Sequence, residues 1–205
     1  MRPLNLFLKR AFDLVGGIII FIILSPILLI GIALIKVKMP GPIFFRQERV
    51  TKNGKVFNIL KLRTMKVDRE AESNFDSTKD EERITPLGRV LRRLKIDETP
   101  QLINVIKGDM SFVGPRPTIM KQVELYSNRQ RQRLKMRAGM TGLAQVNGNV
   151  SLSWEQRIEY DIEYVTHFSI WMDIKILFKT IGVIINGEEK YKKEIKEGEK
   201  LCGPF

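Results

Sequence analysis

The stretch LVGGIIIFIILSPILLIGIALI, residues 14–35, is uncharged and apolar, and Ser25-Pro26 stands at its midpoint. As an unbroken helix it would be about 33 Å long, which is enough to cross the hydrocarbon core of a bilayer. Pro26 removes one backbone donor and clashes with the preceding turn, so we expect a kink there, with the Ser25 hydroxyl available to bind a freed carbonyl. The run therefore predicts a membrane segment with a bend in its middle.

Basic residues flank this run at both ends: Lys9 and Arg10 before it, and Lys36, Lys38 and Arg46 after it. Because positively charged residues prefer the cytoplasmic side of a membrane, a straight span would place one cluster on the wrong side. We therefore expect residues 1–40 to form a re-entrant hairpin that turns at Ser25-Pro26 and returns to the same face. An ordinary kinked span is the alternative, since proline is common in membrane helices.

The 205 residues allow one globular domain beside the membrane segment. We assign residues 41–187 to a cytoplasmic catalytic domain and residues 188–205 to a charged, disordered tail. One His and one Cys do not supply a zinc site, so any metal should be Mg²⁺ or Mn²⁺ bound by oxygen ligands. The net charge of +12 indicates a polyanionic partner, and the membrane segment favours anionic lipid or a phosphorylated substrate over nucleic acid. Solubility alone is the alternative explanation of the charge.

The patterns after the membrane segment predict a mainly helical α+β domain. Two strands are expected over residues 43–50 and 56–63, joined through Asn53-Gly54, followed by a loop or short helices over residues 68–83. The later elements are a helix opened by Thr99-Pro100 and ended by Gly108, a glycine-interrupted loop over 139–148, a helix from a Ser153–Gln156 capping box to about His167, and an apolar helix over 170–185.

A short basic amphipathic helix is expected between the strands and Thr99. Leu87, Leu91 and Leu94 fall at helical spacing, and arginines crowd the remaining positions. Such a helix can lie on a membrane surface or can pack its apolar face on the core, and this segment does not decide between the two.

Asp97 and Glu98 are adjacent carboxylates next to this basic segment. Local positive charge and the dipole of the following helix should both favour their ionised forms. An ionised carboxylate can act as a nucleophile or as a Mg²⁺ ligand. Taken alone, the pair also fits two acidic residues that only interact with the helix dipole.

Arg116 is bracketed by Pro115 and Pro117 in a stretch of glycine and proline. The two prolines fix the backbone on both sides of this long side chain. A guanidinium held in place suits a bidentate phosphate contact, and a rigid surface turn is the alternative.

Five motifs follow one another in the chain: the kinked segment with Ser25-Pro26, KLRTM at 61–65, IDETPQL at 96–102, GPRP at 114–117 and TGLAQVNG at 141–148. With these motifs, the chain resembles a small monotopic phosphoglycosyl transferase of the bacterial sugar transferase family, over about residues 9–185. The resemblance implies transfer of a sugar-1-phosphate from a UDP-sugar to a polyprenol phosphate at the cytoplasmic face of the bacterial inner membrane. Membrane lipid is then a further partner, nucleic acid is not expected, and a homodimer stays open.

The resemblance also implies roles for named residues. Asp97 would attack the phosphate next to the sugar, release UMP and form a phosphoglycosyl-aspartate, and polyprenol phosphate would then attack this intermediate. Glu98 would assist, with Mg²⁺ near both carboxylates. The matched phosphate-binding positions are Lys61, Arg92 and Arg116, and Asp161 matches another acidic position of the active-site region.

Two residues depart from the family's pattern: Asn149 stands where Arg is common, and Ala138 where Pro is common. The first departure bears on sugar specificity more than on the reaction. Two other functions stay open from the residues themselves. One is a membrane-tethered basic module that binds anionic lipid or nucleic acid without catalysis, and the other is a transferase that moves the sugar without its phosphate and releases UDP.

Overall fold

The computed structural model describes residues 3–68 and 80–186, so the expected tail at 188–205 and most of the polar segment at 68–83 lie outside the described residues. The α-helices are α1 (Pro3–Lys38), α3 (Asp80–Arg83), α4 (Pro86–Arg93), α5 (Gln101–Lys107), α6 (Met120–Glu124), α7 (Leu143–Val146), α8 (Trp154–Thr166) and α9 (Ile170–Asn186). The strands are β1 (Phe44–Val50), β2 (Val56–Leu62), β3 (Met110–Val113) and β4 (Ala138–Thr141). The protein is mainly helical with two small sheets, as the sequence predicts.

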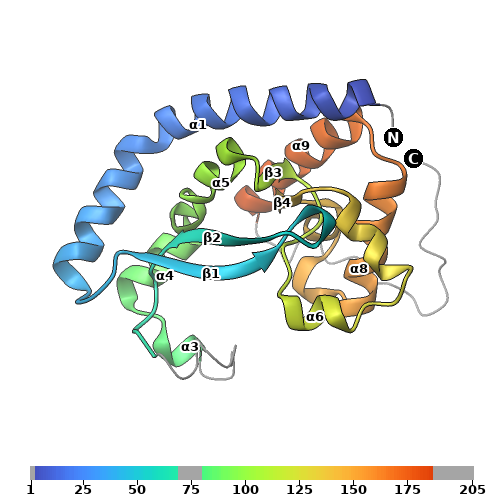
Figure 1. Ribbon diagram of the computed structural model, residues 1–205. Helices are drawn as coiled ribbons and strands as arrows, with labels where there is room; N and C mark the ends of the chain where they lie inside the picture. The colour runs from blue at the N-terminus through green and yellow to red at the C-terminus, as the bar shows by residue number, and fades with distance from the viewer. Residues whose placement is uncertain (1–2, 69–79, 187–205) are drawn as a thin grey trace.

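Helix α1 is one long helix that bends part-way along its length (Figure 1). Pro26 lies inside it, and the Ser25 hydroxyl donates a 2.8 Å hydrogen bond to the carbonyl of Ile22, the acceptor that an N–H at position 26 would otherwise bind. This confirms the expected capture of a freed carbonyl. The segment is nevertheless a bent helix and not a pair of antiparallel arms, and its placement in a membrane stays a prediction.

Both ends of α1 are fastened to the rest of the chain by polar contacts. Near its start, Lys9 forms a buried 2.6 Å ion pair with Asp173 of α9, and Arg10 donates hydrogen bonds to the last carbonyls of α5. Near its end, Arg63 donates to the carbonyls of Met39 and Pro40. The helix therefore lies along the globular part and does not project away from it (Figure 1).

The β-hairpin forms where the sequence predicts it. Strands β1 and β2 pair antiparallel from Phe44 opposite Leu62 to Val50 opposite Val56. Asn53 and Gly54 connect them with φ angles of 58° and 78°, the left-handed conformation that Asn-Gly turns adopt.

Two sequence predictions are wrong at the level of elements. The loop expected over residues 139–148 contains most of β4, which pairs parallel with β3, and the whole of α7. Thr99 is not an N-cap, because it has helical angles (φ −52°, ψ −38°) and continues a 3-10 turn, Ile96–Glu98; α5 then starts at Gln101 and ends at Gly108 as expected. The capping box of Ser153 and Gln156 at the start of α8 is confirmed.

The main core lies where the hairpin, α5, β3, β4, α7, α8 and α9 meet. A second cluster joins the C-terminal half of α1 to β2 and α4, and Leu91 is fully enclosed in it. Leu87 packs against the same cluster, whereas Leu94 is exposed. Helix α4 thus packs both of its leucines against the core, and Leu94 follows its last residue.

Candidate active site

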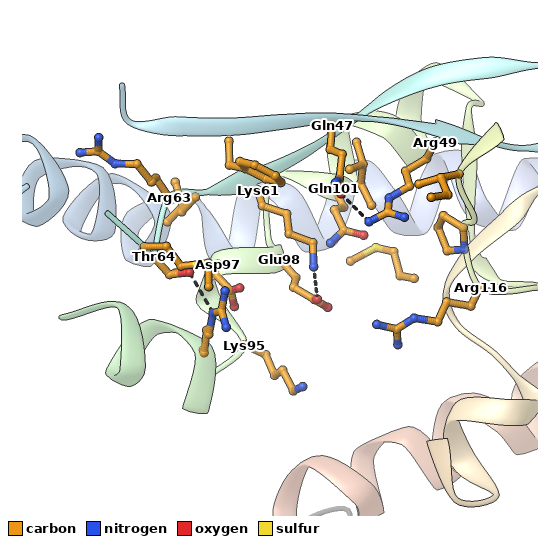
Figure 2. Close-up of a pocket in the computed structure, with 18 of the residues that line it drawn as sticks. Gln47, Arg49, Lys61, Arg63, Thr64, Lys95, Asp97, Glu98, Gln101 and Arg116 are labelled. Atoms are coloured by element: carbon orange, nitrogen blue, oxygen red, sulfur yellow. Dashed lines mark hydrogen bonds and ion pairs between the residues drawn. The ribbon is translucent and has the colours of Figure 1, made fainter. Parts of the chain in front are cut away.

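A cavity of about 600 Å³ opens between the hairpin, α4, the turn Ile96–Glu98 and the segment after β3 (Figure 2). Five of the six residues that the sequence nominated for chemistry or phosphate binding line it: Lys61, Arg92, Asp97, Glu98 and Arg116. These residues come from three separate parts of the chain, and the fold brings them together.

Asp97 lies in the middle of the 3-10 turn and is 7% exposed. Lys95, just before it, has the left-handed conformation (φ 56°), and Asp97 lines the cavity. Its Oδ1 is buried and has no hydrogen-bond partner among the described residues. Burial raises the pKa of Asp97 from 3.8 to about 6, with a further contribution from the Glu98 charge, against the opposing effect of Lys61, Arg92 and Lys95. The sequence had predicted that the surroundings of Asp97 favour its ionised form. That prediction is wrong, because it considered the nearby cations and left out the burial of the carboxylate.

Glu98 differs from Asp97 although the two are adjacent in sequence. Its Oε1 accepts a 2.6 Å ion-pair contact from the Lys61 ammonium, which extends from β2 (Figure 2). Burial alone would raise the pKa of Glu98, but Lys61 and, more weakly, Lys95 and Arg116 lower it overall. The site therefore holds one carboxylate that is ionised well below neutral pH and one that titrates near pH 6.

Arg92 reaches the cavity from the last turn of α4. Its Nε donates a 2.9 Å hydrogen bond to Thr64 Oγ1, just beyond β2. The start of α4 is fixed at the same place, because Thr85 caps the helix by accepting from the Gly88 N–H and Thr85 N–H donates to the Thr64 carbonyl. This contact between α4 and the end of β2 sets the position of the guanidinium beside Asp97.

Arg116 is exposed at the rim of the cavity, between its two prolines. The turn that carries it packs backbone to backbone on β4: a Cβ on Gly114 would lie 2.3 Å from the Arg137 carbonyl, and one on Gly139 would lie 2.2 Å from Gly114 N. Its Nη1 donates a 3.4 Å hydrogen bond to the Asn149 side chain, so the residue that departs from the family's pattern lies directly beside the expected phosphate contact.

Asp161 does not line the cavity. It is 1% exposed on α8, where its carboxylate binds the guanidinium of Arg133, which is itself buried. Arg133 also donates to the Tyr126 hydroxyl and, at 2.8 Å, to the backbone carbonyl of Arg116. Burial alone would lower the pKa of Arg133, but Asp161 and Tyr126 raise it above its usual value, so this guanidinium stays charged. Asp161 thus supports the Arg116 turn from behind.

A divalent cation fits the donor set only if a substrate supplies further ligands. No group of three or more His, Cys, Asp or Glu side chains suited to a metal occurs within residues 3–68 and 80–186. Asp97 offers a buried carboxylate oxygen without a partner, and Glu98 has one oxygen outside the Lys61 contact. Mg²⁺ is commonly held by one or two carboxylates together with substrate phosphates, so these two residues fit such an ion.

Several cavity residues were missed at the level of sequence: Gln47, Arg49, Lys95, Gln101 and Gln145. Gln47 and Arg49 alternate along β1 with exposed neighbours, and their period of two on the inward face was the available signal. Gln145 falls in the TGLAQVNG motif, and its buried Oε1 has no partner among the described residues. Lys95 and Gln101 lie at the two ends of the IDETPQL segment, without a pattern that separates them from ordinary surface or core positions.

Comparison with known proteins supports the resemblance seen in the motifs. The model of the family described as bacterial sugar transferase matches residues 4–187. The chain belongs to the bacterial sugar transferase family. This sugar transferase is 43% identical to the uncharacterized sugar transferase EpsL of Bacillus subtilis, over 96% of each chain. It is also 40% identical to a UDP-glucose:undecaprenyl-phosphate glucose-1-phosphate transferase of Caulobacter vibrioides, over 89% of this chain and 72% of that protein, and 37% identical to the exopolysaccharide production protein ExoY of Sinorhizobium fredii, over 93% and 91%.

Proposed function

We propose that this sugar transferase moves a sugar-1-phosphate from a UDP-sugar to a polyprenol phosphate, at the cytoplasmic face of the membrane that α1 enters. The named relatives support the two substrate classes, because similar proteins are named as transferases of glucose-1-phosphate from UDP-glucose to undecaprenyl phosphate. The single observation that carries the proposal is the buried Asp97 carboxylate, with an unpartnered oxygen, in a cavity lined by cations.

The proposed reaction has two displacements at one phosphorus. An Asp97 oxygen forms a bond to the phosphorus that carries the sugar, the bond from that phosphorus to the bridging oxygen breaks, and UMP leaves with that oxygen. An oxygen of the polyprenol phosphate then bonds to the same phosphorus and displaces the Asp97 carboxylate. The product is a polyprenol diphosphate sugar, and the enzyme is returned unchanged.

The side chains around Asp97 supply charge and position. Lys61 holds Glu98, and Arg92 is held by Thr64, so both cations are oriented before a diphosphate arrives. Such preorganised charge is the main contribution a protein makes to phosphoryl transfer. A Mg²⁺ bound by Asp97, Glu98 and the diphosphate would neutralise charge on the phosphates.

A non-catalytic binding module accounts less well for this site. A module for anionic lipid or nucleic acid would gain from exposed cations, whereas a carboxylate buried among them weakens anion binding unless it takes part in chemistry. Transfer of the sugar without its phosphate would yield UDP, so the nucleotide product separates that alternative from the proposal.

The test is the nucleotide released from UDP-sugars by the detergent-solubilised protein with Mg²⁺ and polyprenol phosphate. The wild type should release UMP, and Asp97→Asn should reduce release by at least about 10³-fold, because the amide oxygen is a poor nucleophile. The variant should still fold, since it removes a carboxylate whose ionisation burial disfavours. UDP as the product, or UMP release retained by Asp97→Asn, would refute the proposal.

A further inference from the structure

The cations of the cavity are spread along its length and do not surround Asp97 on all sides. Lys61, Arg92 and Lys95 are the cations that lower the pKa of Asp97, whereas Arg116 acts on Glu98 and on Arg49. Figure 2 shows the same order: Asp97 lies toward one end, Lys61 and Glu98 lie in the middle, and Arg49 and Arg116 lie at the other end. The cavity therefore has a second cationic end away from the carboxylate.

Arg49 and Arg116 line this far end, and their side chains extend into the cavity from different parts of the chain (Figure 2). Within the described ranges, neither guanidinium forms an ion pair with a carboxylate, and burial together with the Arg116 charge lowers the pKa of Arg49. The Arg49 guanidinium is held in the cavity by a hydrogen bond to the Gln47 side chain, from the same inward face of β1 (Figure 2). Two guanidinium groups close enough to repel each other at the end of a cavity fit a site that takes an anion between them.

The geometry of displacement at phosphorus indicates which anion would bind at this far end of the cavity. In phosphoryl transfer the attacking and leaving oxygens lie roughly in line, on opposite sides of the phosphorus. With Asp97 as the attacking group, the leaving group must depart toward the end of the cavity that lies opposite Asp97. Negative charge develops on that leaving phosphate, and fixed cations there stabilise it.

We propose that Arg49 and Arg116 bind the phosphate of the leaving nucleoside monophosphate, with Gln47 orienting Arg49. This inference rests on the proposed function and extends it, because it fixes the direction in which the UDP-sugar lies: nucleotide toward Arg49, transferred phosphate toward Asp97. The acceptor phosphate takes the same place once UMP has left, because its attacking oxygen must also approach the phosphorus from the side opposite Asp97.

The experiment measures the two half-reactions separately with the full-length protein in detergent. In the absence of acceptor, labelled UMP should exchange into UDP-sugar, and Arg49→Gln should raise the UMP concentration at half-maximal exchange by about tenfold or more. The discharge of isolated phosphoglycosyl-enzyme to polyprenol phosphate should also slow at limiting acceptor concentration, because the acceptor phosphate takes the place that UMP has left. Arg49→Lys keeps the positive charge but loses the planar guanidinium, so it should raise the UMP concentration at half-maximal exchange by less. This variant replaces Arg49→Gln in the test if Arg49→Gln does not fold.

Arg46→Gln is the matched control, because Arg46 lies on the same strand but on its exposed face. It should leave both half-reactions unchanged. An unchanged half-saturation by UMP in both Arg49 variants would overturn the inference. Absence of exchange and of a phosphoglycosyl-enzyme in the wild type would refute the proposed function instead, so the two failures are distinguishable.

Discussion

Asp97 is placed where its own ionisation is unfavourable. Burial and the neighbouring Glu98 charge raise its pKa to about 6, and three cations do not reverse this effect. The cations line the same cavity, and within the described residues none of them forms an ion pair with this carboxylate. Polar groups that are poorly satisfied in the fold but suited to a charged ligand are typical of reaction sites.

If Asp97 is the nucleophile, as proposed, its raised pKa predicts the pH dependence of the first half-reaction. Nucleophilic attack needs the ionised carboxylate, so kcat/KM for the UDP-sugar should rise with pH between about 5 and 7 and then level off. The sign follows from the group: above its pKa the carboxylate is charged and active, and below it the acid is neutral and inactive. Steady-state kinetics across this range would check the midpoint. Glu98→Gln removes the neighbouring negative charge and should shift the midpoint to lower pH, whereas a pH-independent kcat/KM would contradict the assignment.

Asp161 should affect catalysis through the Arg116 turn and not by contact with substrate. Asp161→Asn leaves the buried Arg133 charge without its counter-charge, so the free energy of unfolding should fall by about 3 kcal/mol. Donor KM should rise more than kcat falls, and the effect on KM should vanish in an Arg116→Ala background, because the two substitutions act through one contact.

Glu159→Gln on the same helix is the control for Asp161→Asn. Glu159 pairs with Arg129 in a largely exposed ion pair, so its loss should cost at most about 1 kcal/mol and leave kinetics unchanged. Additive effects of Asp161→Asn and Arg116→Ala on donor KM would show that Asp161 does not act through Arg116.

The residues of the site could be nominated from the motifs, but their environments could not. Lys61, Arg92, Asp97, Glu98 and Arg116 do line one cavity. The pKa of Asp97 was misjudged because burial depends on what packs over the turn, and Asp161 was expected in the site although it lies behind it. A short motif reports residue identity and order, whereas depth is set by the whole fold.

The elements that the sequence predicts well carry a local signal. The Asn-Gly turn, the capping box of α8 and the Gly108 stop each have a residue whose conformational preference selects the structure. Strands β3 and β4 carry no such signal, because a parallel pair depends on contacts between distant segments. The prediction that Thr99 is an N-cap was wrong because the 3-10 turn before it already gives Thr99 helical angles.

At Gly88 of α4, packing against the end of β2 and helix propensity predict opposite effects of a substitution by alanine on stability. A Cβ on Gly88 would lie 1.9 Å from the Thr64 carbonyl, so Gly88→Ala must push α4 away from β2 and displace Arg92. Although Ala favours a helix by about 1 kcal/mol, the overlap should give a net loss of about 1–3 kcal/mol in stability and a lower kcat. Thermal unfolding and the UMP assay would measure both. Arg89→Ala, on the exposed side of α4, should leave both near wild type, and a Gly88→Ala protein with normal activity would exclude this account.

At the scale of the whole molecule, two helices, α1 and α9, expose large apolar side chains. Along α1, Phe7, Ile23 and Val37 are each more than 60% exposed, and on α9 Trp171 and Phe178 are more than 70% exposed. Helix α9 is joined to the start of α1 through the buried Lys9–Asp173 ion pair. Exposed apolar surface of this extent, on a helix long enough to cross a bilayer, favours a membrane as the surface it contacts.

The fastening of both ends of α1 to one globular part predicts its topology. Lys9 and Arg10 bind α9 and α5 at one end, and Arg63 binds the carbonyls of Met39 and Pro40 at the other. A helix that crossed the bilayer would have to break one of these sets and expose a buried charge to lipid, at a cost of several kcal/mol. In a Cys202→Ser background, Asn5→Cys and Lys38→Cys should therefore both react with a membrane-impermeant maleimide only in inside-out vesicles. Labelling of one position from each side would establish a full span, and with it a separation of α1 from the domain that carries Asp97.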